Sequence, residues 1–139
     1  MKSSMRFAVL TLCLLLAGRS IAEDGKPAPV PKHTTDSTDT VRKMLADKKA
    51  VLLDVREPAE WKEGHLKDAR NLPLSEIEAA KDLEALLKDV PKGRAVYLHC
   101  ASGRRCLKAA GILRDTGYDL RPLRDGFDDL LKAGFPEAK

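Results

Sequence analysis

The sequence predicts an α/β domain in which a mainly parallel central sheet carries helices on both faces. From Asp36 onward, short apolar runs typical of buried strands alternate with segments whose apolar residues recur at helical spacing. Parallel strands need long crossover connections, and helices between the strands provide them. Ligands of such sheets bind beyond the carboxyl ends of the strands, so we expect the functional site at that edge.

The first expected helix begins near Asp36 or Ser37, with Val41, Met44 and Leu45 on one face. The other elements continue the alternation. They are strands over residues 50–53, 95–98 and 120–123, a helix over 104–116 that ends at Gly117, and a helix over 127–133.

A further helix is expected between the first two strands. Ser75 and Glu78 have the spacing of a capping box. A helical apolar stripe follows and stops before Pro91; it consists of Ile77, Leu83, Leu86 and Leu87.

The first 22 residues resemble a signal peptide. Lys2 and Arg6 form a basic start, residues 7–17 are apolar, and Ser20-Ile21-Ala22 offers small residues for cleavage. An apolar stretch of eleven residues is shorter than the roughly 20 that a membrane-spanning helix needs. We therefore expect a periplasmic or secreted protein without stable membrane insertion after signal cleavage.

Residues 23–35 form a proline-rich linker, and residues 36–139 form one domain. Cleavage after Ala22 removes Lys2, Arg6 and Arg19 and lowers the formal charge from +4 to +1. The basic character of the chain thus lies mostly in the leader, and no nucleic-acid partner is expected.

A cysteine lies where the second strand ends and a helix begins. Cys100 is followed by Ala101, Ser102 and Gly103, and then by Arg104 and Arg105. Free backbone N–H groups and the helix dipole stabilise an anion at a helix N-terminus. The pKa of Cys100 should therefore fall below the free value of about 8.5, which makes this thiol a candidate nucleophile.

The length of the loop that follows Cys100 distinguishes between classes of enzyme that use a cysteine nucleophile. A tyrosine-phosphatase loop has five residues between its cysteine and a phosphate-binding arginine, but here Cys106 stands at that arginine's position and Arg105 comes one residue early. The shorter loop suits a single sulfur atom better than phosphate or arsenate. A phosphatase or an arsenate reductase is therefore disfavoured.

The chain resembles a single-domain rhodanese, a thiosulfate sulfurtransferase, over about residues 36–136. Three segments carry the resemblance, with Asp68, Cys106 and Asp125 as departures from the family pattern. The segments are the loop from Cys100 to Arg105, the stretch Leu52-Leu53-Asp54-Val55-Arg56-Glu57 with the Gly64-His65 motif after it, and the stretch from Gly117 to Phe127.

The resemblance implies a two-step sulfur transfer. The Cys100 thiolate takes sulfane sulfur from a small-molecule donor such as thiosulfate, and the persulfide lies among the amides of residues 101–105. A thiophilic acceptor, cyanide or a thiol, then removes the sulfur. Neither a metal nor an organic cofactor is expected, since the loop dipoles stabilise the charge.

The polar residues around the loop have several possible roles. Arg105 either recruits an anionic donor or is a solvated residue at the helix start, and nothing orients Arg104 inward. Arg56 either lines the pocket or pairs with a carboxylate, and Asp54 is expected to be a structural acceptor. His99 is expected to be structural, because neighbouring strand residues face opposite ways.

Two alternatives remain open from the sequence. One is a thiol redox protein that uses a Cys100/Cys106 disulfide, which requires Cα atoms within about 7 Å. The other is a non-catalytic binding module with the same fold. For Cys106 we favour a packing role over that of a resolving thiol.

Overall fold

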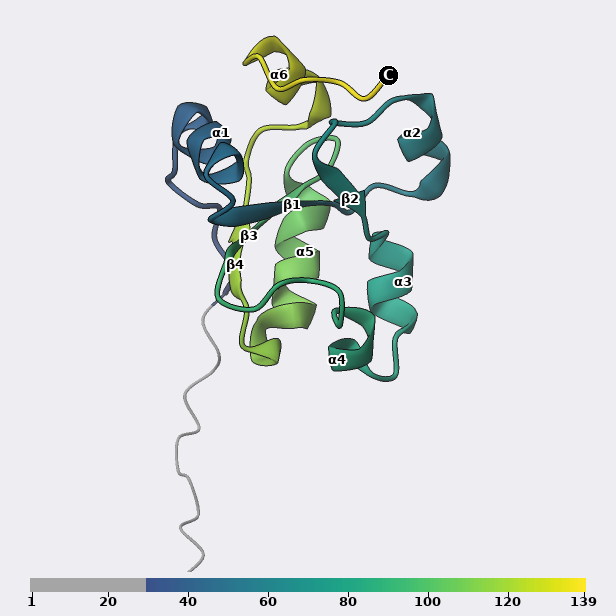
Figure 1. Ribbon diagram of the computed structural model, residues 1–139. Helices are drawn as coiled ribbons and strands as arrows, with labels where there is room; N and C mark the ends of the chain where they lie inside the picture. The colour runs from purple at the N-terminus through teal and green to yellow at the C-terminus, as the bar shows by residue number, and fades with distance from the viewer. Residues whose placement is uncertain (1–29) are drawn as a thin grey trace, which may run out of the picture.

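Four parallel strands form the centre of the fold, in the spatial order β2-β1-β3-β4 (Figure 1). The computed structural model describes residues 30–139. Its strands are β1 Ala50–Asp54, β2 Ala69–Asn71, β3 Ala95–His99 and β4 Asp119–Pro122. All three strand pairs are parallel, and this sheet confirms the predicted fold class.

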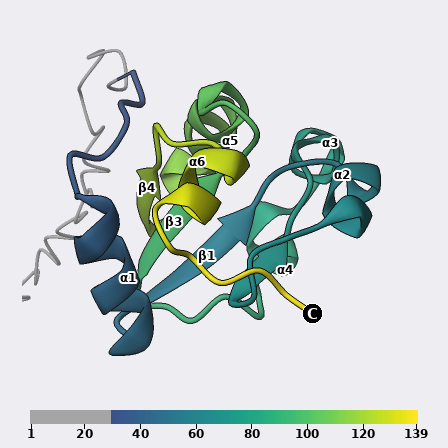
Figure 2. The same cartoon turned by 90° about the horizontal axis from the view of Figure 1, so that it is seen from above.

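Helices cover both faces of the sheet, as predicted (Figure 2). Strand side chains alternate between the faces, so Leu53 and Leu98 pack into one core while Leu52 and Tyr97 pack into the other. The helices are α1 Thr38–Ala46, α2 Pro58–Glu63, α3 Leu74–Ala79, α4 Leu83–Leu86, α5 Arg104–Leu113 with the 3-10 turn η1 Arg114–Thr116, and α6 Phe127–Lys132.

The two cores assign the helices to faces. Residues of α3 and α5 bury apolar side chains in the core that contains Leu98, together with partly buried side chains of α4. Residues of α1 and α6 pack in the core that contains Tyr97. Fully burying one such side chain contributes about 1.5–3 kcal/mol, so the sheet is held from both sides and its carboxyl edge is left for the site.

The prediction of a single helix between Ser75 and Pro91 is wrong. The segment forms α3 and α4, and the Asp82 side chain caps α4 by accepting from the Ala85 amide at 3.0 Å. Ser75 lies inside α3, where its hydroxyl donates to Glu57 at 2.6 Å. The apolar spacing alone predicts one continuous helix, but the Asp82 cap starts a new helix within the segment.

The capping box occurs instead at α2, an element that the sequence analysis did not predict. Glu57 and Glu60 are its two members, and Pro58 occupies the first helical turn. The three-residue strand β2 was also missed, because it is too short to show alternation. It is held by pairing with β1, where Asn71 lies opposite Asp54.

The other boundaries agree with the sequence to within a few residues. Ser37 caps α1, and the predicted glycine stop lies at Gly117 in the left-handed conformation, with φ 77°. The predicted signal peptide and most of the predicted linker lie outside the described residues. Within residues 30–139, no helix is long and apolar enough to cross a bilayer.

Candidate functional site: a cysteine at the start of a helix

Cys100 directly follows β3, and its loop turns into α5 through Gly103. Gly103 is the N-cap of α5 and has φ 80°, a conformation that other residues seldom adopt. Its amide donates to the Cys100 Sγ at 3.1 Å. A side chain at this position would also come within 2.6 Å of the Arg124 carbonyl oxygen. The glycine therefore aims a backbone N–H at the sulfur, as the sequence predicts.

The surroundings of Cys100 lower its pKa from 9.0 to about 5. The largest cause is a hydrogen bond from the Cys106 side chain, and backbone amides of the loop and first helical turn add to it, while burial opposes them. Cys100 is consequently a thiolate at neutral pH. The direction agrees with the sequence-based argument, but the largest cause is a neighbouring thiol rather than the backbone N–H groups.

Cys106 is a buried hydrogen-bond donor in the first turns of α5. Its Sγ lies 3.0 Å from the Gly103 carbonyl oxygen and 3.1 Å from that of Leu123. The Cys100 thiolate and burial raise the pKa of Cys106, so this thiol keeps its proton. The one S–H can turn from a carbonyl to the stronger charged acceptor once Cys100 ionises. Both sulfurs are free thiols here.

Arg105 is held by a carboxylate from α2. Its two terminal nitrogens donate to the two Glu60 oxygens at 2.6 and 2.7 Å. The Arg105 bonds lower the pKa of Glu60 to about 2, and Glu60 in turn raises the pKa of Arg105. The structure thus gives Arg105 a fixed partner that the sequence analysis did not identify. Arg104, Ala101 and Ser102 are exposed.

Arg56 does both of the things that the sequence left open. Its Nε and Nη2 donate to Asp54 at 2.9 and 2.7 Å, Nη2 also donates to the Gly64 carbonyl at 2.7 Å, and the guanidinium lies 4.0 Å from the Phe127 ring centre. Asp54 is fully buried and accepts these bonds, as the sequence analysis expects. Arg56 also lines a cavity of about 230 Å³ beside Ala101.

His99 is the last residue of β3 and is fully buried. Its Nε2 lies 3.6 Å from Asp54 Oδ2, beyond hydrogen-bond distance, and neither ring nitrogen has a partner among the described residues. Burial lowers the pKa of His99, so the ring is neutral near pH 7. Among the described residues neither ring nitrogen hydrogen-bonds to the Cys100 sulfur, which agrees with a structural role.

Access to the nucleophile is closed in this conformation. Cys100 has 0% of its surface exposed. One cavity beside the loop is lined by Ala101 of the loop and by Arg56, Glu60 and Phe127, among others. A small molecule therefore reaches the Cys100 sulfur only after a movement of the loop or of the cavity wall.

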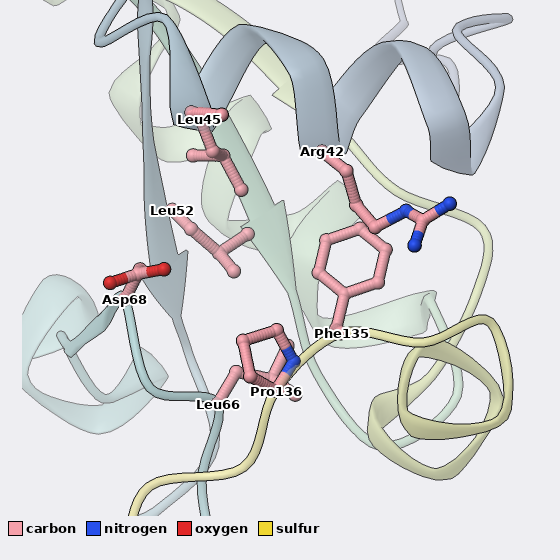
Figure 3. A pocket seen from close by; sticks show the side chains of 8 residues that line it. Arg42, Leu45, Leu52, Leu66, Asp68, Phe135 and Pro136 are labelled. Atoms are coloured by element: carbon pink, nitrogen blue, oxygen red, sulfur yellow. The ribbon is translucent and has the colours of Figure 1, made fainter.

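A second cavity lies away from this loop. It is enclosed by α1, β1 and the C-terminal segment, with Leu52 and Phe135 among its walls (Figure 3). None of the loop residues lines it. No cysteine lines this cavity. Among residues 30–139, no cluster of three or more His, Cys, Asp or Glu side chains could hold a metal ion.

Comparison with known proteins places this geometry in context. Residues 37–133 match the family model described as the rhodanese-like domain. A sulfurtransferase of Allochromatium vinosum is 34% identical over 101 residues, which cover 71% of this chain and 89% of that protein. The human single-domain sulfurtransferase TSTD1 superposes with a TM-score of 0.58 and 27% identity, over 68% of this chain and 91% of that chain.

A third relative is only partly covered. YqhL of Bacillus subtilis is 38% identical over 81 residues, which amount to 58% of this chain and 60% of that protein. The match thus spans less than two thirds of that relative.

Proposed function

This chain belongs to the rhodanese-like domain family, and we propose that it is a sulfurtransferase whose nucleophile is Cys100. The observation that carries the proposal is the Gly103 amide that donates to the Cys100 sulfur at the start of α5. The Cys106 thiol and the backbone amides of Ser102, Cys106 and Arg105 lower the pKa of Cys100 to about 5. The sulfurtransferases of Allochromatium vinosum and human TSTD1 support the same reaction class.

The proposed first half-reaction transfers one sulfur atom to the enzyme. The Cys100 thiolate attacks the outer sulfur of thiosulfate, a new S–S bond forms, and the original S–S bond breaks as sulfite leaves with its electron pair. The enzyme is left with a persulfide that carries one negative charge. Backbone amides aimed at the site of a thiolate also stabilise a persulfide anion one bond further out, since they need no rearrangement.

The second half-reaction returns the thiolate. Cyanide or a thiolate acceptor attacks the terminal sulfur, and the S–S bond to Cys100 breaks with its electron pair on Cys100. With cyanide the product is thiocyanate; with a thiol acceptor it is a persulfide. No external oxidant is consumed, and the proposed partners are small-molecule donors and thiophilic acceptors.

Arg105 has a more restricted part in this proposal than the sequence suggested. Its bidentate ion pair with Glu60 balances the positive charge of the guanidinium and connects α5 to α2. Recruitment of an anionic donor through Arg105 would compete with that ion pair. We propose that Arg105 chiefly orients the loop, and that the donor meets the amides of Ala101 to Gly103 first.

We also propose that the protein is exported, on the basis of the leader pattern in residues 1–22. The mature N-terminus would follow Ala22, and the domain would work in the periplasm or outside the cell. Mass measurement of the protein recovered from the periplasm or medium tests this; a chain that retains residues 1–22 would contradict it.

Intact mass after incubation with thiosulfate tests the chemistry. We expect a gain of one sulfur atom that cyanide removes, in the wild-type protein and in Cys106→Ser. Cys100→Ser should gain none, because its oxygen cannot form a persulfide, while its thermal transition stays close to wild type. Sulfur uptake by Cys100→Ser would refute the assignment of the nucleophile. No uptake by the wild-type protein would favour the non-catalytic binding module.

A further inference from the structure

A segment ahead of α1 lies along the edge of the sheet and reaches the Cys100 loop. The chain passes beside β4 before it enters α1 (Figure 1). The Thr34 amide donates to the Pro122 carbonyl at 2.8 Å. Pro31 comes close to Gly111 of α5, with 3.4 Å between its Cγ and the position of a Cβ there. Residues 31–36, called the strap below, therefore pack on the domain, although residues up to 35 belong to the predicted linker.

The strap is anchored at its C-terminal end by a partly buried hydrogen-bond network. Asp36 accepts from the Tyr97 hydroxyl at 2.6 Å and from Arg121 at 2.9 Å. Tyr97 has 0% of its surface exposed and lies in the middle of β3, the strand that leads into Cys100. This anchor limits the positions open to the rest of the strap.

In the middle of the strap, His33 contacts the Cys100 loop itself. Its Nε2 lies 2.8 Å from the Gly103 carbonyl oxygen. A carbonyl oxygen only accepts, so Nε2 carries the hydrogen in this contact. The contact is close: a Cβ on Gly103 would lie 3.1 Å from the same nitrogen.

Gly103 is the residue through which the strap can act on the sulfur. Its carbonyl oxygen accepts from His33 and from the Cys106 thiol, while its amide donates to Cys100. Glycine has no side chain to restrict its dihedral angles, so these hydrogen bonds keep the left-handed conformation that directs the amide at the sulfur. Without His33, the Gly103 carbonyl oxygen keeps only the Cys106 thiol as a donor. That thiol also lowers the pKa of Cys100.

We propose that His33 is a positioning residue for Cys100, which holds the Gly103 peptide so that its amide faces the reacting sulfur. The proposal rests on Cys100 as the nucleophile of the proposed function. It predicts that a change in the strap, 67 residues before the nucleophile in sequence, alters the reactivity of the thiol as well as the stability of the fold.

The experiment compares His33→Phe with His33→Gln in the full chain. Phenylalanine keeps a planar ring of similar size but cannot donate, whereas glutamine offers an amide N–H at a similar distance from the backbone. The measured quantity is the rate of alkylation of Cys100 by iodoacetamide as a function of pH, followed on the Cys100 peptide by mass spectrometry. Thr35→Ala, at an exposed neighbouring position, is the matched control.

We expect His33→Phe to raise the apparent pKa of Cys100 by about half a unit, a threefold change in its ionisation constant, as for one weakened hydrogen bond. The kcat of sulfur transfer should fall with it, while His33→Gln and Thr35→Ala stay close to wild type. An unchanged pKa in His33→Phe, with or without a lower melting temperature, would overturn the proposal. Alkylation needs no sulfur donor, so a protein without sulfurtransferase activity would refute the proposed function and leave this comparison valid.

Discussion

The thiol of Cys106 should control how acidic Cys100 is, and replacing it with alanine is the sharpest test of the site. The pKa of Cys100 is lowered from 9.0 to about 5, with the Cys106 hydrogen bond as the largest cause. A hydrogen bond to a charged group is worth about 1.5–3 kcal/mol, and one pKa unit is 1.36 kcal/mol. Cys106→Ala should therefore raise the pKa of Cys100 by about 1 to 2 units.

The effect is largest in acid. The lowered pKa of Cys100 means that its thiolate persists as the pH falls from 9 and is lost only around pH 5. A change in pKa from about 5 to about 6.5 lowers the thiolate fraction at pH 5.5 from about three quarters to about one tenth. Alkylation of Cys100 in Cys106→Ala should therefore be about eightfold slower than in wild type at that pH, and nearly equal to it at pH 9.

Cys106→Ser is the matched control, because a hydroxyl donates where a methyl group cannot. It should keep a low Cys100 pKa and sulfur transfer close to wild type. Equal shifts in the serine and alanine variants, or no shift in either, would show that the backbone amides alone set the acidity of Cys100. A Cys100–Cys106 disulfide in most of the exported protein would instead support the redox alternative, with Cys106 as a resolving thiol.

Three further outcomes follow from buried contacts around the loop. Asp54→Ala should lower the free energy of unfolding by about 3–5 kcal/mol, measured by urea titration, because it leaves a buried guanidinium unpaired; a loss below about 1 kcal/mol would contradict that account. Gly126→Ala places a Cβ 1.8 Å from the Ala101 carbonyl oxygen, so it should displace the loop and slow alkylation of Cys100 at pH 7, whereas an unchanged rate would mean that the loop yields freely. Arg105→Ala should weaken the use of thiosulfate and of a neutral persulfide donor about equally if its partner is Glu60, and a loss confined to thiosulfate would restore Arg105 as the donor-binding residue.

Local sequence patterns were sufficient for most of the fold. Apolar runs located three of the four strands to within one or two residues, since burial on both faces leaves a continuous apolar signal. Glycine at residue 117 marked the end of the α5 region correctly. The helix expected from Ser75 failed because a side-chain cap at Asp82 outweighs apolar spacing. The strand β2 was missed because three residues carry no period.

The sequence alone determined the position of Cys100 at the end of a strand and the start of a helix, because both elements are set by neighbours in the chain. Only the tertiary structure decided which side chains act on the loop. Glu60 meets Arg105 across 45 residues, and His33 meets Gly103 across 70. Periodicity describes a single element, whereas these contacts depend on how α2 and the strap pack against the sheet. For the same reason, the structure rather than the sequence places the Cys106 thiol among the groups that lower the pKa of Cys100.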